Sequence, residues 1–221
     1  MKIINKKSEK SLIDQFIRDF KKDYLRKKKQ NKRLSFVLTG GKSPIKLYRR
    51  LAQINIDWNI IDLFWGDERY VSHQSRNSNF KLAFNEFIKK IEIDKKNIFP
   101  IKTNKSISKC SADYSKEIKK YFKYKKINFD CCLLGMGEDG HIASIFPNTK
   151  NLYSKFITKP VTRRDFKRIT LSLNVINNSK KILLWLNNKS KSEIYFKIKK
   201  EGIKIPVNNL NKKKTIIYKI H

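Results

Sequence analysis

The sequence predicts an α/β protein in which helices cover both faces of a mainly parallel sheet. Three short and almost continuously apolar runs are each followed by a polar loop that contains glycine. Such runs, unlike alternating ones, are typical of parallel strands that are buried on both faces. The chain has 221 residues and no low-complexity linker or break in composition. Residues 1–221 are therefore interpreted as one doubly wound domain.

The first helix is predicted from apolar residues that recur every three or four positions between Leu12 and Leu25. It ends in the basic run near Lys29. The first strand is the short apolar run at residues 34–39 (LSFVLT). A second helix begins at Pro44, because proline suits the first turn of a helix.

Two further strands are predicted in the same way. Residues 60–65 (IIDLFW) form one, and the helix after it passes through three phenylalanines between Phe80 and Phe87. Residues 129–134 (FDCCLL) form the other, with a short helical turn after the loop that ends at His141. The remaining predicted elements are strands at residues 168–173, 180–186 and 215–220, and a helix from about residue 189 to residue 199.

The polar loops after the first three strands are predicted to lie together. In open α/β sheets, ligands bind where the loops at the carboxyl ends of the strands converge. These loops cover residues 40–44, 66–77 and 135–141. Candidate functional residues are therefore sought there.

The chain is strongly basic, with 52 Lys and Arg against 19 Asp and Glu and a net charge of +33. Such an excess is typical of proteins that bind nucleic acid or anionic membranes. The basic residues are spread along the whole chain rather than gathered in one segment, which favours a bias of composition. No specific nucleic-acid partner is expected, although contact with a polyanion remains the alternative. In either case a basic surface would attract a phosphorylated substrate.

Three cysteines, Cys110, Cys131 and Cys132, show no metal-ligand spacing. Cys131 and Cys132 lie in an apolar run and are predicted to be core residues. No apolar run reaches eighteen residues, and the amino end lacks the apolar segment of a signal peptide. We expect a reducing, cytoplasmic compartment, no membrane contact, and no metal or organic cofactor. The sequence does not specify an oligomeric state.

The first loop contains Gly40, Gly41, Lys42 and Ser43. Glycines between a strand and a helix allow backbone N–H groups to approach an anion, so a sugar phosphate is one candidate ligand. The spacing matches neither a Walker loop nor a dinucleotide fingerprint. A purely structural turn is the alternative.

The second loop begins with Asp67, Glu68 and Arg69, directly after an apolar strand. The planar guanidinium of Arg69 is suited to bind an anion, with Asp67 positioning it. The alternative is a surface turn held by salt bridges. Ser78 and Asn79 stand where the next helix begins, and capping accounts for one of them.

The third loop carries Gly135, Gly137 and Gly140 around Asp139 and His141. Imidazole titrates near neutral pH, so His141 is the candidate general base. Residues two apart do not face each other on a helix, so Asp139 must orient His141 through the geometry of the loop. The alternative is an ordinary hydrogen-bonding histidine at the surface.

These segments together resemble the 6-phosphogluconolactonase family over nearly the whole chain. In order, they are TGGKSP (39–44), WGDERYV (65–71), NSN (77–79), LLGMGEDGHIASIFP (133–147), RITLSLNVINNSKKI (168–182) and Lys191. The segment at residues 133–147 is the most specific. The chain departs from the family pattern at Lys42, where a small residue is frequent, and at Asn188, where glycine is usual.

The family shares a Rossmann-like fold with the glucosamine-6-phosphate deaminases and isomerases. Those enzymes typically continue after the histidine with Phe-Asn-Glu-Pro, whereas this chain continues with residues 142–147 (IASIFP). They also commonly have Tyr at the position of Arg69. Both features favour the lactonases, and a deaminase or isomerase remains the alternative enzyme.

The resemblance implies hydrolysis of 6-phospho-D-glucono-1,5-lactone in the pentose phosphate pathway, with a phosphorylated sugar lactone as the small-molecule substrate. It assigns His141 as general base, Asp139 as the residue that places it, and Arg69 as the contact to the substrate or to the developing oxyanion. The residues that it assigns to substrate binding are Gly40, Gly41, Ser43, Asp67 and Lys191.

Overall fold

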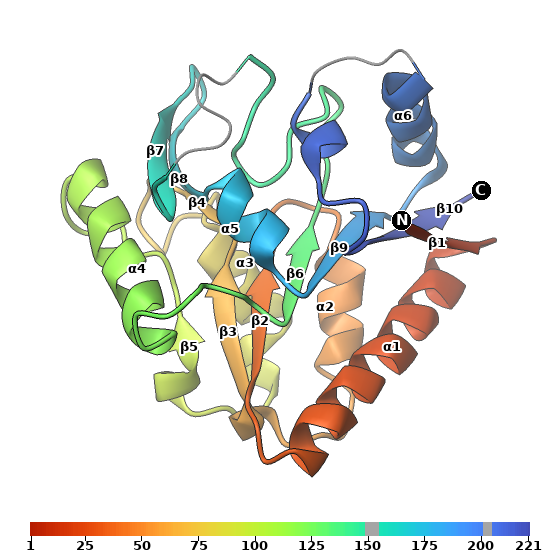
Figure 1. Cartoon of the computed structure of the whole chain (residues 1–221), viewed down its shortest axis with the longest axis horizontal. Helices are drawn as coiled ribbons and strands as arrows, with labels where there is room; N and C mark the ends of the chain where they lie inside the picture. The colour runs from red at the N-terminus through yellow and green to blue at the C-terminus, as the bar shows by residue number, and fades with distance from the viewer. Residues whose placement is uncertain (149–154, 201–204) are drawn as a thin grey trace.

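The computed structural model describes residues 1–148, 155–200 and 205–221. Its central feature is a seven-stranded sheet with the strand order β1-β10-β9-β6-β2-β3-β5 (Figure 1). Every neighbouring pair in this sheet is parallel. The strands are β1 (Lys2–Lys6), β2 (Leu34–Leu38), β3 (Ile61–Trp65), β5 (Ile98–Phe99), β6 (Cys131–Leu134), β9 (Lys181–Leu186) and β10 (Thr215–Ile220).

Strands β6, β2 and β3 are neighbours in the sheet and are buried at every position. The register pairs Leu34 with Ile61 and Leu38 with Trp65, so β2 and β3 begin and end together. Continuous apolar runs are stable here because both faces of each strand are covered. The predicted α/β class with a mainly parallel sheet is confirmed, and the loops after these strands meet at one edge.

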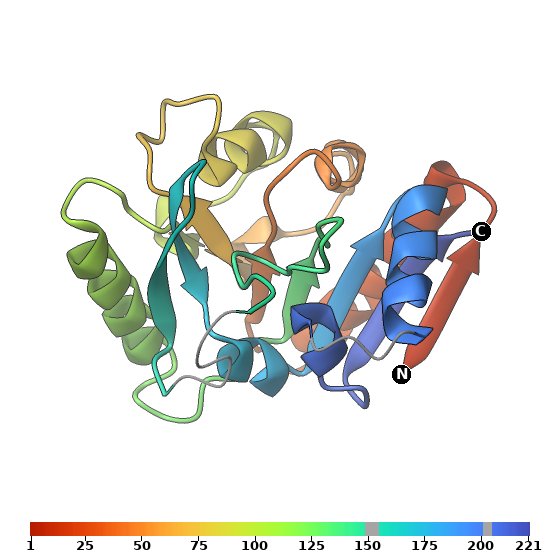
Figure 2. The ribbon, with the colours of Figure 1, turned by 90° about the horizontal axis from the view of Figure 1, so that it is seen from above.

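Six α-helices occur in the described part of the chain: α1 (Glu9–Lys29), α2 (Ile45–Leu51), α3 (Asn79–Glu86), α4 (Ile107–Tyr121), α5 (Leu173–Asn178) and α6 (Lys189–Lys200). Helix α1 starts at Ser8, which forms a capping box with Ser11, and its last turn is basic as predicted. Basic side chains there suit the negative end of the helix dipole. Seen from above, α2 and α3 lie on one side of the main sheet and α5 on the other (Figure 2).

A second, antiparallel sheet stands beside the carboxyl edge of the main one, with the order β4-β8-β7. Its strands are β4 (Asp67–Arg69), β7 (Thr158–Thr162) and β8 (Lys167–Leu171). Gly66 joins the two sheets, because its N–H donates to Leu38 O (2.9 Å) and its carbonyl accepts from Leu171 N (2.8 Å). The chain therefore passes from β3 into β4 over one residue, and the polar segment predicted as a loop begins with a strand.

Other elements differ from the prediction for physical reasons. Strand β1 is not predicted because it is an edge strand, mostly exposed and with lysine at both ends. Helix α4 is not predicted because its buried face consists of Cys110, Ser111, Tyr114 and Ile118, a weakly apolar set. The predicted strand at residues 168–173 ends at Leu171, because helix α5 begins at Leu173.

The predicted helical turn after His141 is wrong. Ile142 and Ile145 instead exchange backbone hydrogen bonds of 3.3 and 2.9 Å and form an isolated β-bridge. Ala143 lies between them at a φ of 48°, which is not a right-handed helical conformation. The chain turns sharply back on itself at this point.

All three cysteines are free and buried, and Cys131 and Cys132 lie in β6, which confirms their predicted place in the core. Within residues 1–148, 155–200 and 205–221, none of the helices has both the length and the apolar character needed to span a membrane.

Candidate active site

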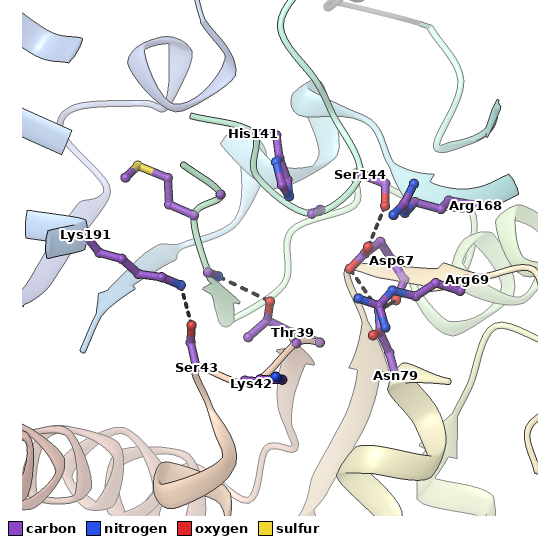
Figure 3. Close-up of a pocket in the computed structure, with 16 residues that line it drawn as sticks. Thr39, Lys42, Ser43, Asp67, Arg69, Asn79, His141, Ser144, Arg168 and Lys191 are labelled. Atoms are coloured by element: carbon purple, nitrogen blue, oxygen red, sulfur yellow. Dashed lines mark hydrogen bonds between the residues drawn. The ribbon is translucent and has the colours of Figure 1, made fainter. Parts of the chain in front are cut away.

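A cavity of about 260 Å³ opens at the carboxyl ends of β2, β3 and β6, between the two sheets (Figure 3). All the residues predicted for the site line it except Asp139, which lies behind His141. Lys191 and Ser43 lie on one side, Arg69 and Asp67 lie on the other, and His141 lies between them (Figure 3). The lining consists of Thr39, Gly40, Gly41, Lys42, Ser43, Asp67, Arg69, Asn79, Gly135, Met136, Gly137, His141, Ala143, Ser144, Arg168 and Lys191.

His141 is held by the loop that contains it. Its Nδ1 lies 2.6 Å from Asp139 Oδ1, and the same oxygen accepts the backbone N–H of His141 at 3.1 Å. An ionised carboxylate can only accept, so the ring proton is assigned to Nδ1 and the lone pair to Nε2. The His141 side chain is one-third exposed. It is therefore open to the cavity, and the lone pair of Nε2 can accept a proton.

Two glycines make this loop possible. A Cβ at Gly137 would collide with the ring of His141 and crowd Asp139. Gly140 has a φ of +77°, a backbone conformation that L side chains rarely adopt, and a Cβ there would also collide with Ile205. The spacing of the glycines is thus required by the way the imidazole is seated.

The loop between β2 and α2 forms the floor of the cavity on the Ser43 side. Gly41 has a φ of +77°, and a Cβ at Gly40 would collide with the side-chain amide of Asn79. The hydroxyl of Tyr48 accepts from the N–H of Thr39 at 3.0 Å and donates to its carbonyl at 2.6 Å, which fixes the start of the loop. The conformation of this loop therefore allows its backbone to approach a ligand closely.

Lys191 reaches this loop from helix α6, and its Nζ donates to Ser43 Oγ at 2.5 Å. Burial lowers the pKa of Lys191, and the charge of Glu138 opposes that effect. Asn188, the departure from the family pattern, accepts the N–H of Lys191 at 2.8 Å and so caps the helix. Asparagine at this position fixes the first turn of α6, which carries Lys191.

Asp67 does not position Arg69, contrary to the prediction. Its carboxylate accepts from Ser144 Oγ at 2.6 Å and lies 3.4 Å from Asn79 Nδ2, while Arg69 Nη1 donates to the carbonyl of Asn77 at 2.8 Å. Asp67 and Arg69 are two positions apart in β4 and so share one face of the strand, and both line the cavity, but each is engaged by a different partner. Asp67 is buried, whereas Arg69 is only partly buried.

Glu68, the middle residue of the charged triplet, lies outside the cavity and anchors helix α3. Its carboxylate accepts the N–H groups of Asn79 and Phe80, both at 2.7 Å, and the hydroxyl of Ser78 at 3.0 Å. Burial raises the pKa of Glu68 to about 7, although these hydrogen bonds favour the ionised form. Ser78 also caps α3 by accepting from Lys81 N, as predicted for one residue of that pair.

Arg168 also lines the cavity and was not among the predicted site residues. It lies directly opposite Arg69 in the antiparallel β4–β8 ladder. Its guanidinium donates to both carboxylate oxygens of Asp165, at 2.9 and 2.5 Å. Like charges directly opposite each other destabilise a ladder; Asp165 compensates the charge of Arg168, whereas Arg69 has no carboxylate partner among the described residues. The sequence alone did not reveal the pairing because β4 was not predicted.

The charges around the cavity are unbalanced. Among the described residues, neither Lys42, Arg69 nor Lys191 has a carboxylate within ion-pair distance. No three His, Cys, Asp or Glu side chains in that part of the chain are grouped to hold a metal ion. The arrangement therefore offers a base, several cations and backbone donors in one small space, which suits an anionic substrate that is opened by water.

Known proteins resemble this chain in sequence and in fold. A 6-phosphogluconolactonase of Thermotoga maritima is 35% identical over 159 residues, or 70% of each chain, and one of Synechocystis sp. is 34% identical over 71% of this chain and 68% of that protein. The Thermotoga maritima crystal structure superposes with a TM-score of 0.88, at 25% identity, over 99% of this chain and 98% of that one. A monomeric glucosamine-6-phosphate deaminase has the same fold, with a TM-score of 0.83 at 20% identity over 100% and 98% of the two chains.

The family model for glucosamine-6-phosphate isomerases and 6-phosphogluconolactonases matches residues 7–218, so this chain is a member of that family.

Proposed function

We propose that this protein hydrolyses 6-phospho-D-glucono-1,5-lactone to 6-phospho-D-gluconate, a step of the oxidative pentose phosphate pathway. The observation that carries the proposal is the imidazole of His141, oriented by Asp139 at 2.6 Å, in a cavity that also presents cations without a carboxylate partner among the described residues. The sequence similarity to 6-phosphogluconolactonases supports the choice of substrate. We expect the reaction to take place in the cytoplasm.

His141 acts as the general base in the first step. Its Nε2 takes a proton from water while the water oxygen bonds to the lactone carbonyl carbon, and the carbonyl oxygen becomes an oxyanion. Asp139 keeps the other ring nitrogen protonated and stabilises the imidazolium that forms. The oxyanion then re-forms the carbonyl as the bond to the ring oxygen breaks. The imidazolium returns the proton to the ring oxygen, and the new carboxyl group ionises.

The cations on the two sides of the cavity bind different parts of the substrate, the phosphate on one side and the developing oxyanion on the other. Lys191, Ser43 and the backbone of the Gly40–Gly41 turn bind the phosphate, and this binding holds the ring for attack. Arg69 stabilises the oxyanion from the opposite side, and positive charge that is already in place often supplies most of an enzyme's rate enhancement. Asp67, held by Ser144, accepts hydrogen bonds from the sugar hydroxyls.

The test is lactone hydrolysis by the His141→Ala variant, corrected for spontaneous opening of the lactone. Removing a general base typically lowers the rate by a factor on the order of 10²–10⁴, so turnover should fall by that factor while circular dichroism stays unchanged. His73→Ala is the matched control. His73 bonds to the carbonyl of Ile101 and stacks on Phe80, outside the cavity, so that variant should keep its activity.

Parent-like hydrolysis by a folded His141→Ala variant would contradict the assignment of the base. Release of ammonia from glucosamine 6-phosphate by the parent protein would favour the deaminase alternative.

A further inference from the structure

The aromatic ring of Phe146 packs against the imidazole of His141. The two ring centroids are 4.6 Å apart and the planes are inclined by 37°. Phe146 is buried, with 8% of its surface exposed. It is not among the residues that line the cavity.

The bond to Asp139 alone does not fix the orientation of the imidazole. One hydrogen bond at Nδ1 restrains one edge of the ring, and the ring can still tilt about the Cβ–Cγ bond as far as that hydrogen bond tolerates. A flat neighbour against the ring face restricts that tilt. Asp139 and Phe146 together therefore determine the direction in which Nε2 points.

The turn after His141 brings the two rings together. Ile142 and Ile145 are buried and joined by their backbone bridge. The hydroxyl of Ser144 donates to Asp67, and the backbone N–H of Ser144 donates to Thr170 Oγ1 at 3.2 Å. These contacts return the chain so that residue 146 meets residue 141, although the two are five positions apart.

Phe146 is itself held from the small sheet. The guanidinium of Arg163 lies 4.5 Å from the ring centroid and that of Arg168 lies 5.3 Å from it. Both distances are within the range of a cation–π interaction. Arg168 is restrained in turn by its paired hydrogen bonds to Asp165. The imidazole is thus connected, through one aromatic ring, to the second sheet.

We propose that Phe146 is a positioning residue for the general base: its ring holds the plane of the His141 imidazole so that Nε2 faces the substrate cavity. The proposal rests on the proposed role of His141. Phe146 has no place in substrate binding, so its loss lowers kcat and leaves KM unchanged. A small rotation of the imidazole is sufficient to lower kcat, since misplacement of a reacting group by 1 Å can lower the rate up to about 10²-fold.

The test compares Phe146→Leu, which removes the flat ring face, with Phe146→Tyr, which keeps it. We expect kcat of the leucine variant to fall roughly tenfold with KM within twofold of the parent, and the tyrosine variant to restore kcat. Phe146→Met fills the volume without a flat face, and it carries the same comparison if the leucine variant does not fold. Unchanged kcat in the leucine or methionine variant, or a rise in KM alone, would overturn the proposal.

A double-variant cycle separates positioning from general destabilisation. In a His141→Ala background there is no base to position, so adding Phe146→Leu should lower the residual rate no further. An additional tenfold loss there would assign Phe146 a structural role instead. If His141→Ala itself hydrolyses the lactone at the parent rate, the proposed function of His141 fails, independently of the outcome for Phe146.

Discussion

Charged side chains are compensated differently at the two ends of the parallel strands, which we call the amino edge and the carboxyl edge of the main sheet. At the amino edge, three buried aspartates each bond to a basic side chain. Asp130 bonds to Lys27 and Lys180, Asp62 bonds to Arg33, and Asp23 bonds to Lys181, all at 2.5–2.7 Å. At the carboxyl edge, Lys42, Arg69 and Lys191 surround the cavity without a carboxylate partner among the described residues.

This difference separates charges that build the fold from charges that bind a ligand. A buried charge is costly unless a partner compensates it. At the amino edge the partners are side chains of the same chain, so the buried charges there are compensated in the folded protein. The cations of the carboxyl edge have no such partner in the described part of the chain: Lys42 is exposed, Arg69 and Lys191 are only partly buried, and under the proposed function the substrate supplies the negative charge. Its doubly anionic phosphate and the developing oxyanion carry that charge.

Among the variants that test this difference between the two edges, Lys191→Met is expected to have the largest effect. The substitution removes a charge-assisted hydrogen bond, worth roughly 1.5–3 kcal/mol, and therefore lowers kcat/KM roughly 10- to 100-fold, mainly through KM. Steady-state hydrolysis of the lactone measures it. The neighbouring but exposed Lys189→Met serves as the matched control and should leave KM unchanged. An unaffected KM in Lys191→Met would remove this residue from the phosphate site.

Lys27→Met should affect stability and leave activity alone. Lys27 Nζ lies 2.7 Å from Asp130 Oδ1, and both side chains are less than one-tenth exposed. Burial alone would raise the pKa of Asp130, but hydrogen bonds from Lys180 and Lys27 hold it below its usual value. Loss of one partner should lower the free energy of unfolding by about 1–3 kcal/mol.

Chemical denaturation and lactone hydrolysis measured on the same Lys27→Met preparation check this prediction. A fall in kcat/KM at temperatures where the variant is fully folded would mean that the two edges are not independent.

Glu68, like Asp67, departs from the pattern of the amino edge: it is buried near the carboxyl edge and bonds to the start of helix α3 instead of to a basic side chain. Its folded-state pKa of about 7 lies above the ordinary 4.5, so the native state binds the proton more tightly than the unfolded state. The stability that this group contributes is fully present below about pH 4.5 and is lost as the pH rises through about 7.

Relative to Glu68→Gln, the parent should therefore lose stability between these pH values, by up to about 1.4 kcal/mol per pH unit. Denaturation curves at several pH values measure the slope, with the exposed Glu92→Gln as the control. Identical slopes for the parent and Glu68→Gln would contradict the raised pKa.

The sequence predicted the parts of the molecule that depend on strong local patterns. The buried strands β2, β3 and β6 have continuous apolar runs, and the loop of His141 has Gly137 and Gly140 at positions that only glycine fits. The edge strand β1 and the weakly apolar helix α4 lack such patterns and escaped prediction.

Tertiary pairing explains what the sequence could not predict at the site. Arg168 comes to the cavity because β8 pairs with β4, and the bond from Ser144 to Asp67 joins residues 77 positions apart. The interpretation of Asp67 as the partner of Arg69 was wrong because Asp67 bonds to Ser144 and Arg69 bonds to the carbonyl of Asn77, and no local pattern reveals these partners.

The most direct test of this account is thermal unfolding with and without 6-phosphogluconate, the product of the proposed reaction. Ligand that binds only the native state raises Tm, so the parent should be stabilised by the phosphorylated acid and not by gluconate. Lys27→Met should start from a lower Tm and show the same rise, while Lys191→Met should show little or none. An equal rise with gluconate, or a full rise in Lys191→Met, would contradict the claim that the unpaired cations of the carboxyl edge bind the substrate.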